Sequence, residues 1–274
     1  MARTRPQPQG RNLKERVEVL GVGVDPVRSG ELGEHILSLV RTDRNEAGPA
    51  LVLNVNAHGL NLACREKSLK RLLDSADIVF ADGFGVLLAA RMAGGYLPER
   101  ITYADWAWNL AQLAESRELS VFLLGGRPCV ARRAAGNLLR VHPELRVCGT
   151  HHGYFDRRTD GPENRRVVEA IEAAAPDLLL VGLGMPVQEE WLLENRRELR
   201  AKVAFNCGAA LDYLSGELVR GPRFLTNNGF EWLARLLIEP GRLWRRYLLG
   251  NPVFLFRAVK QAVISRARAG RNPI

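Results

Sequence analysis

Five short apolar runs recur along the first 215 residues, and polar or glycine-rich segments bound each of them. They are Leu51–Val55, Ile78–Phe80, Leu119–Leu124, Asp177–Gly182 and Lys202–Asn206. Stretches with helical periodicity separate them, from about Leu60 to Ser75, from Val86 to Met92, and from near Pro128 onward. Because continuously apolar strands that alternate with helices are typical of a parallel sheet covered on both faces, the pattern predicts an α/β fold. We expect a Rossmann-like sheet with helices on both faces.

Glycine and polar residues follow every predicted strand. These segments are Asn54-Val55-Asn56, Asp82-Gly83, Gly125-Gly126-Arg127, Gly182-Leu183-Gly184-Met185-Pro186-Val187-Gln188 and Asn206-Cys207-Gly208. The carboxyl ends of parallel strands meet at one edge of a sheet, where glycines let a ligand approach the backbone and helix N-termini attract phosphate. None of the segments is a GxGxxG or Walker loop, and a glycine after a strand is often only a turn. Together they predict a nucleotide or sugar-nucleotide pocket.

The last 59 residues form a basic, amphipathic tail. Apolar side chains recur there at helical spacing: Phe230, Leu233, Leu236, Leu237, Leu243, Trp244, Tyr247 and Leu248. Arginines interleave with them, and Pro240-Gly241 predicts two short helices in place of one long helix. Such helices are suited to the headgroup region of an anionic membrane. The alternative is that the apolar stripe packs on the rest of the protein.

Charge divides the chain into three parts. Residues 1–16 have a net charge of +4, residues 17–215 of −3 and residues 216–274 of +8. We expect a disordered basic arm over 1–16, a catalytic domain over 17–215 and a helical appendage over 216–274. No apolar stretch approaches the ~20 residues that a membrane span requires, and the N-terminus lacks the apolar core of a secretory signal. The four cysteines are scattered without metal-ligand spacing, which fits a cytoplasmic protein with reduced thiols.

Asp82 is the best-placed carboxylate for acid–base chemistry. It follows a predicted strand and precedes a glycine, so it can face a ligand at the sheet edge as a general base. The alternative is that it caps the next helix or closes a turn. We find no Asp-x-Asp motif in a loop that could hold a cation, because Asp74 and Asp77 have the wrong spacing. Arginines or helix dipoles can instead neutralise a diphosphate leaving group. We therefore expect no metal and no cofactor.

A co-linear series of motifs over about residues 17–257 resembles the WecG/TagA/CpsF glycosyltransferase family (glycosyltransferase family 26). The motifs are Asp82-Gly83-Phe84-Gly85-Val86 with Pro98-Glu99-Arg100-Ile101-Thr102, Phe122–Gly126, Gly153-Tyr154-Phe155, Val181–Glu189, Asp212–Gly216, Arg220-Gly221-Pro222, Glu231-Trp232 and Glu239-Pro240 to Arg246. The resemblance implies an inverting transfer of a sugar from a UDP-sugar to a polyprenyl-diphosphate-linked acceptor. It also implies a location in the cytoplasm, peripherally associated with the inner face of the cell membrane, and a role in polysaccharide biosynthesis.

The resemblance also implies roles for individual residues. It makes Asp82 the base, and it assigns donor or phosphate contacts to Asn56, Arg100, Gln188, Asp212, Arg235, Arg242 and Arg245. Asn54, Gly125 and Gly184 complete the expected binding site at the strand ends. The sequence departs from the family pattern at Asn54, His58 and Tyr103, which surround the expected sugar pocket. The donor therefore stays open among mannosaminyl, mannosaminuronyl, glucosyl and glucuronosyl sugars.

Other classes of protein are compatible with parts of the sequence. A basic nucleic-acid-binding protein would explain the arginines but gives no use for Asp82, so we expect no nucleic-acid partner. A non-catalytic, membrane-associated scaffold of a polysaccharide assembly complex would keep the tail but not need Asp82. A nucleotide-sugar epimerase or dehydrogenase would need the dinucleotide fingerprint that this sequence lacks. Homo-oligomerisation is left open.

Overall fold

The computed structural model describes residues 15–42, 44, 47–227 and 229–269. Most of the arm expected over residues 1–16 lies outside them. The strands are β1 Val17–Val19, β2 Val22–Val24, β3 Ala50–Val55, β4 Ile78–Ala81, β5 Ser120–Gly125, β6 Arg146–His151, β7 Leu178–Gly182 and β8 Val203–Asn206. The helices up to residue 215 are α1 Ser29–Arg41, α2 Ala57–Ala63, α3 Lys67–Ser75, α4 Phe84–Met92, α5 Tyr103–Ser116, α6 Val130–Val141, α7 Pro162–Ala174, α8 Val187–Asn195 and α9 Ala210–Leu214. The described part of the tail contains α10 Arg223–Asn227, α11 Glu231–Ile238, α12 Pro240–Trp244, the π-helical turn η2 Arg245–Leu249 and α13 Gly250–Ala269.

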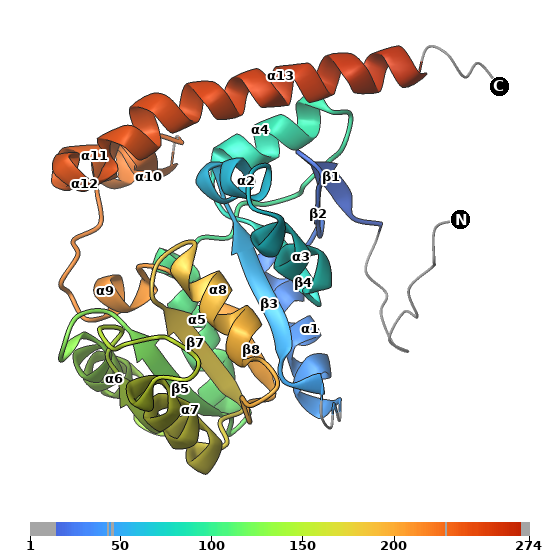
Figure 1. The fold of residues 1–274 in the computed structure, drawn as a ribbon. Coiled ribbons are helices and arrows are strands. Elements are labelled where there is room, and N and C mark those ends of the chain that lie inside the picture. The colour runs from blue at the N-terminus through green and yellow to red at the C-terminus, as the bar shows by residue number, and fades with distance from the viewer. Residues whose placement is uncertain (1–14, 43, 45–46, 228, 270–274) are drawn as a thin grey trace.

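A parallel sheet of six strands forms the centre of the described part, in the order β4-β3-β8-β7-β5-β6 (Figure 1). All residues of β3 are buried, and they alternate between two hydrophobic cores. Ala50 and Val52 face the core that α1, α5, α6 and α9 cover. Leu51, Leu53 and Val55 face the core that α2, α3, α4, α7, α8 and α13 cover. The predicted α/β architecture with helices on both faces is confirmed.

The five predicted strands correspond to β3, β4, β5, β7 and β8. The prediction did not include β6 or the antiparallel hairpin of β1 and β2. Strand β6 lies at the edge of the sheet, and its residues are exposed or half-buried, so it carries no continuous apolar run. An edge strand buried on neither face leaves no hydrophobic pattern from which to predict it.

The single helix expected from about Leu60 to Ser75 is wrong. The chain forms α2 and α3, with a break between Ala63 and Lys67. Leu60 and Leu69 are nine residues apart, which is two and a half helical turns, so a straight helix would place them on opposite sides. The break lets both side chains reach the same core, in which they are 0% and 2% exposed.

The tail begins a new helix at Pro240, as predicted, because α11 ends at Ile238 and α12 starts at Pro240. Proline is well suited to a first helical turn, where its missing N–H costs nothing. The expectation of two short helices is wrong for the second one, because α12 continues through η2 into α13, which reaches Ala269. Figure 1 shows α13 as a long rod that crosses one end of the molecule beside α4.

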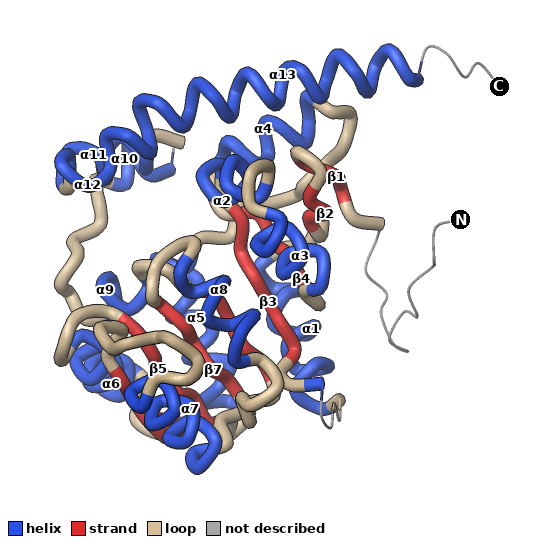
Figure 2. The backbone as a smooth tube through the Cα atoms, in the orientation of Figure 1, coloured by secondary structure: helices blue, strands red, loops and turns tan. Residues whose placement is uncertain are grey.

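Figure 2 shows α13 running above α2 and α4. Side-chain hydrogen bonds attach α13 to two separate parts of the body. Arg257 donates to the backbone oxygen and to Oδ1 of Asn61 at 3.0 and 2.8 Å, and Asn61 Nδ2 donates to the Gly250 oxygen at 2.8 Å. Further along, Gln261 accepts from the Leu20 N–H at 2.9 Å and donates to the Glu18 oxygen at 3.1 Å. The first contact is with α2 and the second with the β1–β2 hairpin. The expected boundary between a domain over 17–215 and an appendage stays a prediction.

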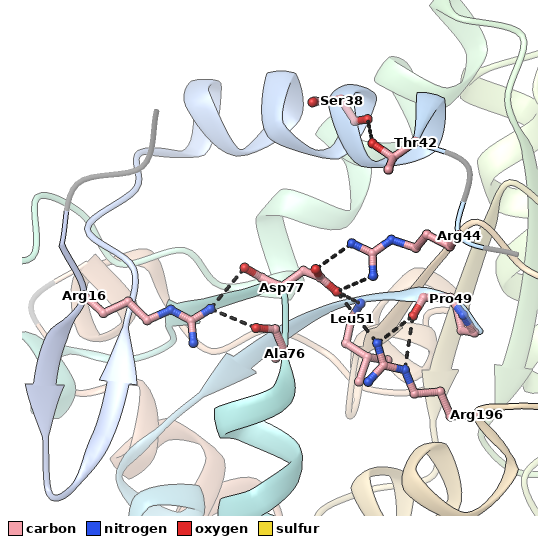
Figure 3. Close-up of polar contacts among 9 residues, drawn as sticks. All are labelled: Arg16, Ser38, Thr42, Arg44, Pro49, Leu51, Ala76, Asp77 and Arg196. Carbon is pink, nitrogen blue, oxygen red and sulfur yellow. Dashed lines mark hydrogen bonds and ion pairs between the residues drawn. The ribbon is translucent and has the colours of Figure 1, made fainter. Parts of the chain in front are cut away.

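At the opposite end of β4 from its carboxyl end, Asp77 connects several segments (Figure 3). Its carboxylate accepts two hydrogen bonds from Arg44, at 2.6 and 3.0 Å, and one from the Leu51 N–H at 3.0 Å. Arg16 donates to the backbone oxygens of Ala76 and Asp77 at 2.9 and 3.0 Å. A buried carboxylate with this many donors fixes the start of β3 and β4 relative to each other.

We expect Asp77→Ala to lower the free energy of unfolding by about 3 kcal/mol, because it leaves the half-buried Arg44 guanidinium and the Leu51 N–H without their acceptor. Asp74→Ala is the matched control three residues away, since Asp74 is 42% exposed in its ion pair with Lys70. It should cost less than about 1 kcal/mol. Chemical denaturation measures both values, and equal losses would contradict a structural role specific to Asp77.

Candidate active site

A cleft of about 1130 Å³ opens at the carboxyl ends of the parallel strands. Residues that follow β3, β4, β5, β7 and β8 line it on one side. Residues of α11, α12 and η2 line it on the other. The sequence predicted a pocket at this edge of the sheet, and the tail supplies a second wall to it.

Asp82 directly follows β4 and lines the cleft. Its backbone N–H donates to the Val55 oxygen at 2.8 Å, and Asn54 Nδ2 lies 3.4 Å from its Oδ2. Gly83, and not Asp82, is the N-cap of α4, with a φ of 97° that favours glycine. Burial, followed by the charge of Glu231, raises the pKa of Asp82 to about 6, against the opposing effect of Arg100, Arg246 and Arg235. Asp82 is therefore mostly ionised at neutral pH and can accept a proton.

Three arginines surround Asp82 from different elements. Arg100 forms an ion pair with Glu231 at 2.7 Å and lies 4.9 Å from the centre of the Phe84 ring. Arg235 of α11 lies 3.6 Å from Glu239 and 5.9 Å from the centre of the Tyr213 ring. Arg100 is not among the residues that line the cleft, whereas Arg235 is. The body and the tail thus both supply positive charge near the candidate base.

Arg246, which the sequence analysis did not select, is the third of these arginines. Its side chain lines the cleft from η2, and burial lowers its pKa although the charge of Asp82 opposes that effect. It also acts on His58, whose pKa burial and then the Arg246 charge lower to about 4. His58 is therefore neutral at pH 7. Spacing alone does not single out Arg246, since Arg245 and Arg246 lie three and four residues after Arg242 and both are its neighbours on a helix surface.

Three further predicted residues are Arg242 and Arg245, which are exposed, and Asp212, which is half-buried. The Arg242 guanidinium contacts Glu239 at 2.6 Å, and the exposed Arg245 stacks on the neighbouring Trp244 at 5.2 Å from the ring centre. Asp212 lines the cleft from α9, and burial raises its pKa although Arg242 acts in the opposite direction. The structure brings all three to the cleft that contains Asp82.

The remaining predicted residues lie at the strand ends in different roles. Asn56 lines the cleft and also accepts a hydrogen bond from the Gly59 N–H at 3.1 Å as the N-cap of α2. Gly184 lines the cleft with a φ of 82°. Gly125 does not line the cleft. A Cβ added to Gly125 would lie 2.3 Å from the Gly182 oxygen of β7, so this position packs against the neighbouring strand. Its neighbour Gly126 is exposed to the cleft instead.

Gln188 is buried, and its side chain is already engaged within the protein. Its Oε1 accepts from the Gly208 N–H at 3.0 Å, and its Nε2 donates to Glu189 Oε1 at 2.8 Å. The buried Glu189 was not selected from the sequence as a site residue. Within residues 15–269, apart from 43, 45–46 and 228, no group of three or more His, Cys, Asp or Glu side chains could hold a metal ion.

Residues 17–268 match the profile of the family described as "Glycosyl transferase WecG/TagA/CpsF family". The chain belongs to this family. As a member of the WecG/TagA/CpsF family it is an enzyme that transfers a glycosyl group, which confirms the activity class that the sequence resemblance implied. The alternatives of a nucleic-acid-binding protein and of a non-catalytic scaffold are not supported.

Curated relatives cover nearly the whole of this family member. A protein of Staphylococcus aureus (strain MRSA252) is 28% identical over 250 residues, which is 91% of this chain and 94% of the relative. A protein of Staphylococcus aureus (strain NCTC 8325 / PS 47) is 27% identical with the same coverage. Both are named N-acetylglucosaminyldiphosphoundecaprenol N-acetyl-beta-D-mannosaminyltransferase. In the described part of our chain, no helix has the length and apolar character needed to cross a membrane.

Proposed function

We propose that this glycosyltransferase moves a hexosamine, with N-acetylmannosamine as the first candidate, from a UDP-sugar to a sugar on a polyprenyl diphosphate. The names of the relatives support this donor sugar and an N-acetylglucosaminyl-diphosphoundecaprenol acceptor. Asp82 removes the proton from the acceptor hydroxyl while its oxygen attacks the anomeric carbon. The bond between that carbon and the diphosphate oxygen breaks, UDP leaves with the electron pair, and the configuration at the anomeric carbon inverts.

The observation that carries the proposal is a carboxylate, Asp82, that lines a cleft together with several arginines. Burial raises the pKa of this carboxylate to about 6. A base with a pKa just below neutral pH is ionised and still binds a proton well in the transition state. The negative charge that develops on the leaving diphosphate needs fixed positive charge nearby. Arg235, Arg242, Arg245 and Arg246 all line the cleft and supply this charge, so the reaction does not need a metal ion.

The surface of the tail supports a peripheral position on an anionic membrane. Large apolar side chains are exposed on η2 and α13 at helical spacing, among them Leu248, Leu255, Val259 and Val263. Arg245, Lys260 and Arg266 are exposed close to them. We propose that this surface lies in the headgroup region, so that a lipid-linked acceptor reaches the cleft from the membrane. The tail would then serve both for membrane association and as one wall of the active site.

Release of UDP from a panel of UDP-hexosamines and UDP-hexoses tests the reaction. We expect release from UDP-N-acetylmannosamine that depends on an N-acetylglucosaminyl-diphosphate lipid acceptor in detergent and persists in EDTA. Release that requires a divalent cation would overturn metal independence, and preference for another UDP-sugar would overturn the assigned donor. If the protein binds no UDP in calorimetry, a UDP-sugar donor is wrong.

A further inference from the structure

A series of buried and part-buried hydrogen bonds connects α8 to Asp82 across the carboxyl ends of β8 and β3, by way of the backbone and side chain of Asn54. It begins at Glu189, whose Oε1 accepts from Gln188 Nε2 at 2.8 Å and from Asn206 Nδ2 at 2.7 Å. It ends where Asn54 Nδ2 lies 3.4 Å from Asp82 Oδ2. Glu189 is 1% exposed and does not line the cleft, so it cannot touch a substrate.

Asn206 is the link between the two ends of this series. Its Oδ1 accepts from the Asn54 N–H at 2.7 Å, and its Nδ2 donates to the Asn54 backbone oxygen at 3.1 Å as well as to Glu189. The β3–β8 ladder pairs Val52 with Phe205 as its last residues. Beyond that point the side-chain amide of Asn206 takes the place of a backbone peptide group and forms both hydrogen bonds to the backbone of Asn54. Glu189 Oε1 accepts a hydrogen bond from Asn206. The NH₂ group of the Asn206 amide must therefore face Glu189, and this fixes the orientation of the amide.

We propose that Glu189 is a positioning residue: by orienting the Asn206 amide it holds Asn54 so that the Asn54 side chain donates to Asp82. This inference rests on the proposed role of Asp82 as the base. Burying a carboxyl group completely costs free energy unless its oxygens accept hydrogen bonds, as Oε1 of Glu189 does. Burial raises the pKa of Glu189 to about 7, although Asn206 and Gln188 donate to it, and its Oε2 has no hydrogen-bond partner in the described part of the chain.

Two substitutions at position 189 separate the acceptor oxygen from the charge. Glu189→Gln removes the ionisable group but keeps an oxygen that can accept from Asn206. Glu189→Met has a similar volume and no oxygen. Glu190→Met is the matched control, because Glu190 is the next residue and is exposed. We expect kcat to fall about 10- to 100-fold in Glu189→Met, with KM for both substrates unchanged, and to stay within about threefold of the wild type in the other two variants.

The titration of Asp82, followed by carbon-13 NMR of aspartate carboxyl groups in the free protein, supplies a readout independent of turnover. The signal that disappears in Asp82→Asn identifies it. Loss of the Asn54 donor should raise the pKa of Asp82 by about half a unit in Glu189→Met but not in Glu189→Gln. Asn206→Ala tests the next link in the same way and replaces Glu189→Met if that variant does not fold.

The outcomes are distinct. An unchanged Asp82 titration together with an unchanged kcat in folded Glu189→Met would overturn the proposal, as would equal effects of the Met and Gln substitutions. If the wild-type protein transfers no sugar from any UDP-sugar in the panel, the proposed function fails. The NMR titration then still decides whether Glu189 positions Asp82.

Discussion

Asp82→Asn is expected to lower kcat about 10³- to 10⁴-fold while the protein stays folded and still binds UDP. The substitution keeps the shape of the side chain but removes its negative charge, and with it the ability to accept the proton of the acceptor hydroxyl. Because Asn54 is the only side chain with a hydrogen bond to Asp82 in the described part of the chain, few structural contacts are lost. Kinetics of UDP release give kcat, and thermal unfolding gives the stability control. A variant that keeps more than a tenth of the wild-type rate would show that Asp82 is not the base.

The pH profile tests the same assignment in the unmodified enzyme. A base must be deprotonated, so kcat/KM should be constant above the pKa of about 6 and should fall tenfold per pH unit below it. Glu231 raises this pKa, so Glu231→Gln should move the acidic limb to lower pH. The substitution also releases Arg100 from its ion pair, which acts in the same direction. A limb that moves to higher pH would contradict this account of the electrostatics.

Arg246→Met is expected to lower kcat/KM about 10²- to 10³-fold, because Arg246 lines the cleft, and the proposed reaction develops negative charge there on a departing diphosphate. Its charge also keeps the pKa of Asp82 from rising further. Arg245→Met is the matched control at the preceding residue, with the same change in side-chain chemistry. Arg245 is exposed and stacks on Trp244. We expect a loss of tenfold or less there, mainly as a higher KM for the lipid-linked acceptor.

Steady-state kinetics with both substrates varied distinguish the two arginines. The decisive quantity is the ratio of the losses of kcat/KM in the two variants, since each variant removes one positive charge. If Arg245→Met is as defective as Arg246→Met, burial near Asp82 is not what makes an arginine of the tail important. Long-range attraction of anionic substrates would then explain the losses better.

The strands and the polar residues at their ends could be predicted because burial on both faces leaves continuous apolar runs. Asp82 and Asn56 were found by this argument because they follow such runs, and Asn54 because it lies near the end of one. The edge strand β6 could not, because its exposed residues follow no such pattern. Neither could Glu189: a sequence does not indicate that a glutamate in the first turn of α8 is 1% exposed.

The tail shows a different limit of prediction. Its amphipathic spacing indicated helices and the Pro240 boundary, but the choice between Arg245 and Arg246 depends on the local geometry of η2. A π-helical turn shifts the angular positions of the residues that follow, so helical spacing from α12 does not identify the side chain that faces the cleft. Only the structure distinguishes these neighbouring arginines.

The attachment of α13 at Asn61 and at the β1–β2 hairpin has a consequence for protein engineering. The tail is not an independent module, because α13 is held by hydrogen bonds to residues more than 180 positions earlier in the chain. In a chimera that joins residues 17–215 of one family member to the tail of another, two features of the body would have to fit the new tail: the side chain at position 61 and the position of the hairpin backbone that Gln261 contacts. The tail is therefore exchanged between family members most safely together with the hairpin and α2 that it contacts.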